Sequence, residues 1–307
     1  MEWKRLGLVY ARMPSKDDEW WHSHTMAPTA LLLDEGTIRV YVGAWDRSGI
    51  SRIGWIDLDS RRPANVLGIS AEPVLDIGRP GTFDENGVFP GHVCQVDKQI
   101  RLYYTGFQLG YKVPHFNFGG LALSQDGEQF ARYSEAPILD RADEGLCVRA
   151  GQSIIEDGDG FLMSYSAGSN WVTTGGKLRP SYDVYVQRSI DGISSQRSGK
   201  CIVRHDPLTE HGLGRPQLVR IHGELYVFYT RRILGMKYLF GCARHTASGW
   251  IRQDDRIMVG HSVDGFDSEM VYFPSVLHVP HTEKTYLFYS GNGFGKTGMG
   301  VCELVRP

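Results

Sequence analysis

The sequence lacks the features that mark a nucleic-acid-binding, membrane-spanning or exported protein. Its 33 Lys and Arg residues nearly balance its 35 Asp and Glu residues, and the net charge of −2 includes no block of one sign, so charge indicates no polyanionic partner. No apolar run approaches the roughly 20 residues that a membrane span needs. The N-terminal stretch "MEWKRLGLVYARMP" carries charges where a signal peptide has its apolar segment. We therefore expect a cytoplasmic protein without a nucleic-acid or membrane partner.

Cysteine is scarce and widely scattered. The five cysteines include no Cys-x-x-Cys spacing, which argues against a zinc site or a disulfide framework and favours reduced, buried thiols. The glycines of "SGNGFGKTGMG" (290–300) are spaced too irregularly for a phosphate-binding loop. Long stretches of helical period are also few. We expect neither a metal ion nor a cofactor.

The chain is instead rich in glycine and aromatic residues, with 37 Gly, 15 Tyr, 13 Phe and 7 Trp. Five segments share one pattern, in which a Pro or Gly opens a short apolar strand, a polar turn follows, and an aromatic strand ends in Tyr. The opening residues are Pro28, Pro90, Gly151, Pro216 and Pro274, and the closing tyrosines are Tyr41, Tyr104, Tyr165, Tyr229 and Tyr289. The units begin about 60 residues apart, which is the mark of a repeated structural unit.

Each unit continues into a third strand, and Asp-Gly turns such as "SQDG" and "SIDG" suit the hairpins that lead there. Units of three to four antiparallel strands, five times over, predict an all-β fold: a five-bladed β-propeller around a central channel. The units fill the chain, so we expect one domain over residues 1–307. The C-terminal "MGVCELV" is expected to pair with the N-terminal strand and close the ring.

In a propeller the segments that precede the first strand of each blade meet at one mouth of the channel. "FDENGVFP" (83–90) and "FDSEMVYFP" (266–274) are two such segments, and they resemble each other. Glu85 and Glu269 each lie five residues before their proline, so the repeat predicts equivalent places for them in blades 2 and 5. Asp267 is expected to form a turn.

Several motifs resemble those of known proteins. The repeat, "GLALSQDGEQF" and "YLFYSGNG" resemble the five-bladed glycoside hydrolases of the arabinanase, invertase and mannoside-phosphorylase kind. More narrowly, "FDENGVFPG", "GRPQLV" and "YLFYSGNGFGKTGMGVCEL" are similar to a glycosylase-like group that accompanies surface-polysaccharide or secondary-metabolite pathways. The resemblance implies a carbohydrate-active enzyme. It does not carry over the catalytic aspartate that those hydrolases place at or near the strand-opening proline of blade 1, because Ala27 stands there.

Hydrolysis of a glycosidic bond commonly uses two carboxyl groups, one as acid and one as base or nucleophile. Asp84, Glu85 and Glu269 are the catalytic candidates, since the repeat brings their segments to one mouth. The alternative is that these acids form ion pairs with arginines or cap neighbouring strands.

The candidate binding residues come from the same mouth and can hydrogen-bond, stack on or neutralise a sugar-derived ligand. They are His22, His24, Trp45, Asp46, Asn86, Arg149, Trp171, Arg215, Tyr272 and Lys296. The two arginines precede the first strands of blades 3 and 4. Such arginines either pair with carboxylates of the protein or recognise an anionic ligand, and the sequence leaves both open.

Three functional hypotheses remain from the sequence. The first is an enzyme that cleaves or transfers a glycosidic bond by carboxylate acid/base chemistry. The second is a biosynthetic enzyme that reuses the propeller for a sugar nucleotide or another small polar intermediate, with His and Arg at work. The third is a propeller that binds sugar without catalysis. In each the partner is a small sugar or a sugar-derived molecule, neutral or anionic.

Overall fold

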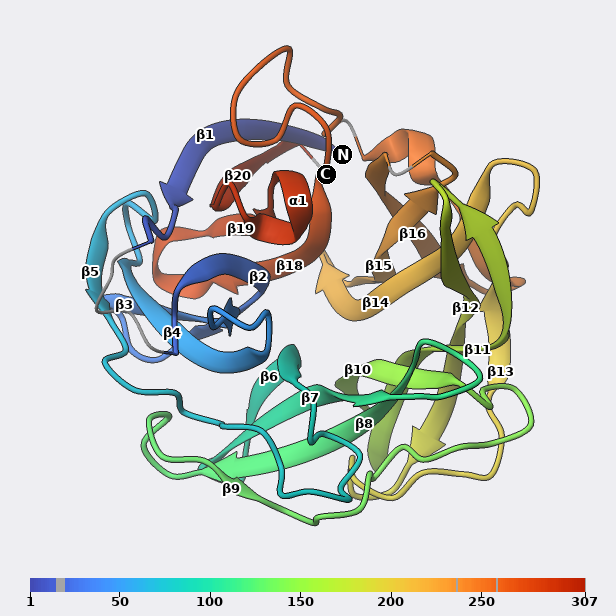
Figure 1. Ribbon diagram of the computed structural model, residues 1–307. Helices are drawn as coiled ribbons and strands as arrows, with labels where there is room; N and C mark the ends of the chain where they lie inside the picture. Colours follow the sequence, from blue (N-terminus) through green and yellow to red (C-terminus); the bar gives the residue numbers. More distant parts are fainter. Residues whose placement is uncertain (15–19, 236, 258, 307) are drawn as a thin grey trace.

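Twenty strands form five blades of four strands each, arranged around a common axis in the computed structural model (Figure 1). The structure describes residues 1–14, 20–235, 237–257 and 259–306. The all-β, five-bladed propeller predicted from the repeat is confirmed. Three short helical turns, η1 (Asp254–Arg256), η2 (Pro280–Thr282) and α1 (Asn292–Gly295), interrupt the strands. Among the described residues, no helix is both long enough and apolar enough to cross a membrane.

In blades 1 to 4 the strands follow one another in sequence from the axis outward, and in blade 5 the N-terminal strand takes the outermost place. In blades 1 to 3 they are β2 (Ser23–Leu32), β3 (Thr37–Trp45), β4 (Ser51–Asp59) and β5 (Val66–Ile69), then β6 (Val88–Val96), β7 (Gln99–Leu109), β8 (His115–Ser124) and β9 (Ala131–Arg132), then β10 (Val148–Asp157), β11 (Gly160–Thr174), β12 (Lys177–Ser189) and β13 (Lys200–Val203). In blades 4 and 5 they are β14 (Glu210–Ile221), β15 (Glu224–Ile233), β16 (Tyr238–Thr246) and β17 (Gly249–Arg252), then β18 (Tyr272–Val279), β19 (Lys284–Ser290), β20 (Met299–Arg306) and β1 (Glu2–Tyr10).

The ends of the chain close the ring. Strand β1 pairs antiparallel with β20 and completes blade 5 from outside, as the sequence predicted. Figure 1 shows the two termini side by side on this blade. Short parallel pairings, such as that of Tyr182 with Gly212, join blade 3 to blade 4. The closing tyrosines of all five units are fully buried, so their aromatic rings fill the core between the sheets.

The first strand of every blade contains a register shift near the axis. At this bulge Ala27, Arg215 and Phe273 have φ angles of 56°, 49° and 54°. A left-handed backbone at a residue with a side chain costs about 1 kcal/mol, and bulges of this kind re-aim side chains next to functional sites. The bulge therefore turns Arg215 and Phe273 toward the mouth of the propeller.

The repeated Phe-Asp pair is a structural element. In blade 2 the ring of Phe83 stacks on Tyr104, with centroids 5.9 Å apart. The buried Asp84 accepts a hydrogen bond from the Tyr104 hydroxyl (3.1 Å) and pairs with Arg132 (2.8 Å). The pair thus anchors the segment before the first strand to the second and fourth strands of its own blade.

Blade 5 repeats the arrangement. Phe266 stacks on Tyr289 at 5.7 Å, and the buried Asp267 accepts from the Tyr289 hydroxyl (2.8 Å) and from Arg5 (3.2 Å). Asp267 lies in a turn, as predicted, and its carboxylate also makes these two bonds. The matching members of the two motifs are Asp84 and Asp267, and not Glu85 and Glu269 as the spacing to proline predicted. Blade 5 has one more residue between the Phe-Asp pair and the proline, and the register shift follows Pro90 in blade 2 but includes Pro274 in blade 5.

Blades 3 and 4 use the same chemistry with other carboxylates. Tyr165 donates to Glu144 (3.0 Å) and Tyr229 donates to Asp254 (2.7 Å). Each carboxylate also pairs with an arginine, Arg149 at 3.1 Å in blade 3 and Arg252 at 2.6 Å in blade 4. Four blades therefore share a tyrosine–carboxylate–arginine chain, which satisfies the buried hydroxyl of the central tyrosine.

Candidate functional site

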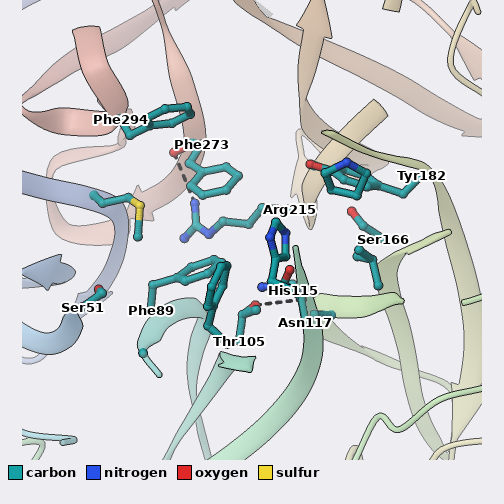
Figure 2. A pocket seen from close by; sticks show the side chains of 18 of the residues that line it. Ser51, Phe89, Thr105, His115, Asn117, Ser166, Tyr182, Arg215, Phe273 and Phe294 are labelled. Atoms are coloured by element: carbon teal, nitrogen blue, oxygen red, sulfur yellow. Dashed lines mark hydrogen bonds between the residues drawn. The ribbon is translucent and has the colours of Figure 1, made fainter. Parts of the chain in front are cut away.

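A cavity of about 360 Å³ opens where the five blades meet. Each blade contributes a residue next to or near the bulge of its first strand. These residues are Met26, Phe89, Ala150, Gly214 and Tyr272. Figure 2 shows Phe89, Phe273 and Phe294 on one side of Arg215, and His115, Ser166 and Tyr182 on the other. The cavity thus has an aromatic side and a polar side, and its volume suits a small-molecule ligand.

Positive charge dominates the polar side. Three arginines line the cavity, Arg179, Arg215 and Arg232, and no Asp or Glu is among the described residues that line it. None of the three forms an ion pair within the described part of the chain. Arg215 is buried, and Arg179 and Arg232 are half-buried. A buried cation is costly unless an anion compensates it. An anion from outside the protein is the partner that this cavity lacks.

Arg215 forms the floor. Its guanidinium donates to the carbonyls of Phe273 (3.2 Å), Pro274 (3.2 Å) and Pro28 (2.9 Å), and to the hydroxyl of Thr29. Blade 4 is thereby tied to blades 5 and 1 across the axis. Complete burial lowers the pKa of Arg215 to about 9, so the side chain remains charged at neutral pH and places an uncompensated positive charge beneath the cavity.

Arg232 and Arg179 form the wall. The guanidinium of Arg232 lies 5.2 to 5.5 Å from the ring centroids of Tyr182, Tyr238 and Tyr272, and it donates one hydrogen bond to the Tyr272 hydroxyl (2.9 Å). Arg179 forms no hydrogen bond with any described residue, and the Nε atoms of both arginines are buried without a partner. Buried donors without a partner are uncommon in native proteins and are explained by a bound ion or water, among other causes; the Nε atoms of Arg101 and Arg244 are in the same state outside the cavity.

Two histidines near these arginines have lowered pKa values. Burial and then the positive charges of Arg232 and Arg179 lower the pKa of His115 to about 4. Burial and the Arg232 charge also lower the pKa of His211 to about 4. His211 donates from Nδ1 to the carbonyl of Pro180 (3.2 Å) when it is neutral. Both rings are therefore neutral at pH 7, and His115 offers the cavity a hydrogen-bonding group that can gain a proton.

A Ser–His–Asp chain supports the cationic wall from behind. Ser181 lies 3.2 Å from Nε2 of His205, and Nδ1 of His205 lies 2.6 Å from Asp183. Because Ser181 and Asp183 belong to β12, this chain ties the strand that carries Arg179 to the segment after β13. It is a positioning device for the wall.

Four of the predicted binding residues line the cavity: Trp45, Asn86, Arg215 and Tyr272. Two others lie directly behind this lining. His24 stacks on Trp45 with centroids 4.0 Å apart, and Trp171 meets His115 edge-on at 5.1 Å.

The remaining predicted binding residues are outside the lining. Arg149 is engaged by Glu144 and by backbone carbonyls of Asp140 and Gln196, and Asp46 pairs with Arg52 at 2.7 Å and closes its own turn. His22 is half-buried, and Lys296 is exposed and contributes to the low pKa of His24, which burial chiefly lowers to about 4.

The three predicted catalytic acids also lie outside the lining. Asp84 is committed to its tyrosine and arginine. Glu85 accepts from the Gly81 backbone N–H (2.7 Å) and from Gln108 (3.0 Å), which lowers its pKa, and Glu269 is exposed. An acid/base pair across the cavity therefore finds no support in their placement.

Sequence reasoning missed Arg179, Arg232 and His115. The repeat contained a signal for Arg232, because residues shortly after the closing tyrosine of the second strand reach the cavity, as Trp45 does in blade 1. Arg232 lies three residues after the closing Tyr229, and Phe107 lies three after Tyr104; both line the cavity. No comparable repeat signal marks Arg179 or His115, which lie near the starts of third strands, β12 and β8.

Comparison with known proteins agrees with this architecture. The chain is 30% identical to the uncharacterized protein Rv1502 of Mycobacterium tuberculosis, over 99% of both chains. The chain belongs to the family of Rv1502. No protein-family model matches it.

Solved structures similar to this Rv1502 relative are five-bladed propeller glycoside hydrolases. One represents glycoside hydrolase family 130, a family of mannoside phosphorylases that contains hydrolases targeting β-1,2-mannosidic linkages in Candida mannan; it is 16% identical, with a TM-score of 0.71 over 98% of this chain and 93% of the other. Another is a thermostable family-43 glycoside hydrolase, 15% identical, with a TM-score of 0.68 over 94% and 91% of the two chains. At such identity the likeness shows the fold, and the cavity has to indicate the chemistry.

Proposed function

We propose that this protein binds a small, sugar-derived anion in the cavity where the five blades meet. The observation that carries the proposal is the set of three lining arginines without a carboxylate partner among the described residues. The shared fold supports a sugar-derived ligand, since the similar structures belong to carbohydrate-active proteins.

The two sides of the cavity recognise different parts of the ligand. Arg179 and Arg232 attract and hydrogen-bond the anionic group, which replaces the water lost on binding with charge-assisted bonds. Phe89, Phe107 and Trp45 present apolar faces to the C–H groups of the ligand. His115, neutral in the free protein, can donate or accept a proton beside the bound molecule. The arrangement suits the His and Arg chemistry of the second hypothesis.

A binding panel tests the proposal. Thermal shift and calorimetry would compare hexose phosphates, uronates and sugar nucleotides with the corresponding neutral sugars. We expect anionic compounds to stabilise the protein and neutral ones to have little effect. The proposal fails if neutral oligosaccharides bind and every anionic sugar is ignored.

Cleavage or transfer of a glycosidic bond is the second candidate, favoured by the fold shared with the hydrolases. It would require Asp84, Glu85 or Glu269 to act on a substrate that extends beyond the cavity. Aryl glycosides, with and without phosphate, would be assayed against the wild type and the Glu85→Gln and Glu269→Gln variants. Turnover that disappears in one of these amide variants would establish this candidate, and turnover unchanged in both would remove the two glutamates from it.

A further inference from the structure

The guanidinium donors of the cavity are unequally engaged. Arg215 uses its terminal nitrogens on carbonyls and a hydroxyl of blades 5 and 1, so its terminal donors are occupied while its charge remains. Arg232 donates to the Tyr272 hydroxyl and also interacts with the Tyr238 hydroxyl, and Arg179 makes no hydrogen bond with a described residue. The free terminal donors therefore lie on Arg179, from β12, and in part on Arg232, from β15.

These two arginines face the same small region. Both line the cavity, and the guanidinium of Arg232 lies 5.2 Å from the ring centroid of Tyr182, which follows Arg179 by three residues on β12. This placement makes Arg179 and Arg232 the two arms of one clamp. A clamp of two planar guanidinium groups matches the oxygens of a tetrahedral oxyanion.

Charge decides between the anions that could fit. The lining carries three guanidinium charges, two histidines close by are neutral, and no described acid lines the cavity. A carboxylate would compensate one of three charges, whereas a phosphate monoester brings close to two charges and three acceptor oxygens. The dianion therefore fits this cavity better than a uronate does.

The aromatic side of the cavity contacts the part of the ligand that does not carry the anionic group. Phe89 and Phe273 stack at 6.0 Å and 18°, and with Phe294 they form the aromatic side seen in Figure 2. A volume of about 360 Å³ is close to the lower end of small-molecule pockets. The remaining space suits a single sugar ring.

We propose that the anionic group of the ligand is a phosphate monoester held between Arg179 and Arg232, and that the ligand is a phosphorylated monosaccharide. This inference rests on the proposed function and narrows it to one class of anion. Arg215 supplies charge from the floor and does not contact the phosphate through its terminal nitrogens.

The test uses inorganic phosphate, sulfate and acetate as probes, titrated by calorimetry at pH 8 into the wild type and three variants. Arg179→Gln and Arg232→Gln each remove one arm. Arg188→Gln is the matched control, because Arg188 lies at the far end of β12 and pairs with Asp157 on the surface. We expect about a tenfold or greater loss of phosphate and sulfate affinity for each arm variant, since a hydrogen bond to a charged group contributes about 1.5–3 kcal/mol, and no change for the control. Acetate should bind at least about tenfold more weakly than phosphate.

Equal affinity for acetate and phosphate would overturn the inference, and so would equal losses in the arm variants and the control. The sugar panel tests the proposed function and the phosphate assignment separately. If hexose phosphates and uronates bind equally well, the proposed function stands and the phosphate assignment falls. If neutral sugars alone bind, the proposed function itself is wrong.

Discussion

Replacing Asp84 with Asn should destabilise the fold without removing a catalytic group. The carboxylate is fully buried, pairs with Arg132 at 2.8 Å and accepts from Tyr104 at 3.1 Å. Removing one partner of a buried ion pair costs about 3–5 kcal/mol. Arg132 keeps 22% of its side chain exposed and a second bond to the Asp76 carbonyl, so we expect the lower end, about 3 kcal/mol.

The assay is thermal and denaturant unfolding of the Asp84→Asn variant beside Glu269→Gln. For a chain of 307 residues, a loss of about 3 kcal/mol corresponds to a fall of roughly 5 °C in the unfolding midpoint. Glu269 is exposed, so its amide variant should unfold like the wild type. A variant of Asp84 with an unchanged midpoint and abolished ligand binding would refute the structural role that the repeat assigns to this residue.

Further predictions concern pH, the repeated tyrosines and the thiols. The pKa of His115 and of His211 is about 4 in the free protein, and a bound anion offsets the arginine charges and raises it, so binding takes up protons; the affinity for sulfate should rise as the pH falls from 7 to 5 in calorimetry, and a falling affinity would contradict this. Tyr229→Phe should lower the free energy of unfolding by about 1 kcal/mol in urea titration, because it removes the 2.7 Å bond from the buried Tyr229 hydroxyl to the half-buried Asp254. Burial raises the pKa of Cys94 and of Cys302 to about 12, so Ellman's reagent should modify them only after the protein unfolds; fast reaction in the native state would contradict their placement.

The fold could be predicted from the sequence because the same pattern of strands and turns occurs five times along the chain. The spacing of the closing tyrosines and the turn chemistry predicted the blades, and the complementary terminal strands predicted the closure by β1 and β20. The repeat also led to one wrong prediction. Because Glu85 and Glu269 each lie five residues before a proline, the spacing predicted equivalent places for them in blades 2 and 5. The register shift lies differently about Pro90 and Pro274, and such a local shift depends on packing that spacing does not record.

The site was only partly accessible for a related reason. Arg215, Trp45, Asn86 and Tyr272 lie close to the repeated first and second strands, and the sequence placed them at the mouth. Arg179 projects from β12, a third strand that has no counterpart of similar length in the other blades. Arg179 matters because it has no ion-pair or hydrogen-bond partner among the described residues. The sequence does not show which arginines are paired; the packed structure does.

The most direct test of the account is to measure phosphate affinity and thermal stability together for Arg179→Gln. Arg179 forms no hydrogen bond or ion pair with a described residue and stands beside two other positive charges. We predict a midpoint equal to or above that of the wild type, together with about a tenfold or greater loss of phosphate affinity at pH 8. Retained affinity, or a loss of affinity that accompanies a lowered midpoint, would contradict the claim that this arginine exists to bind an anion.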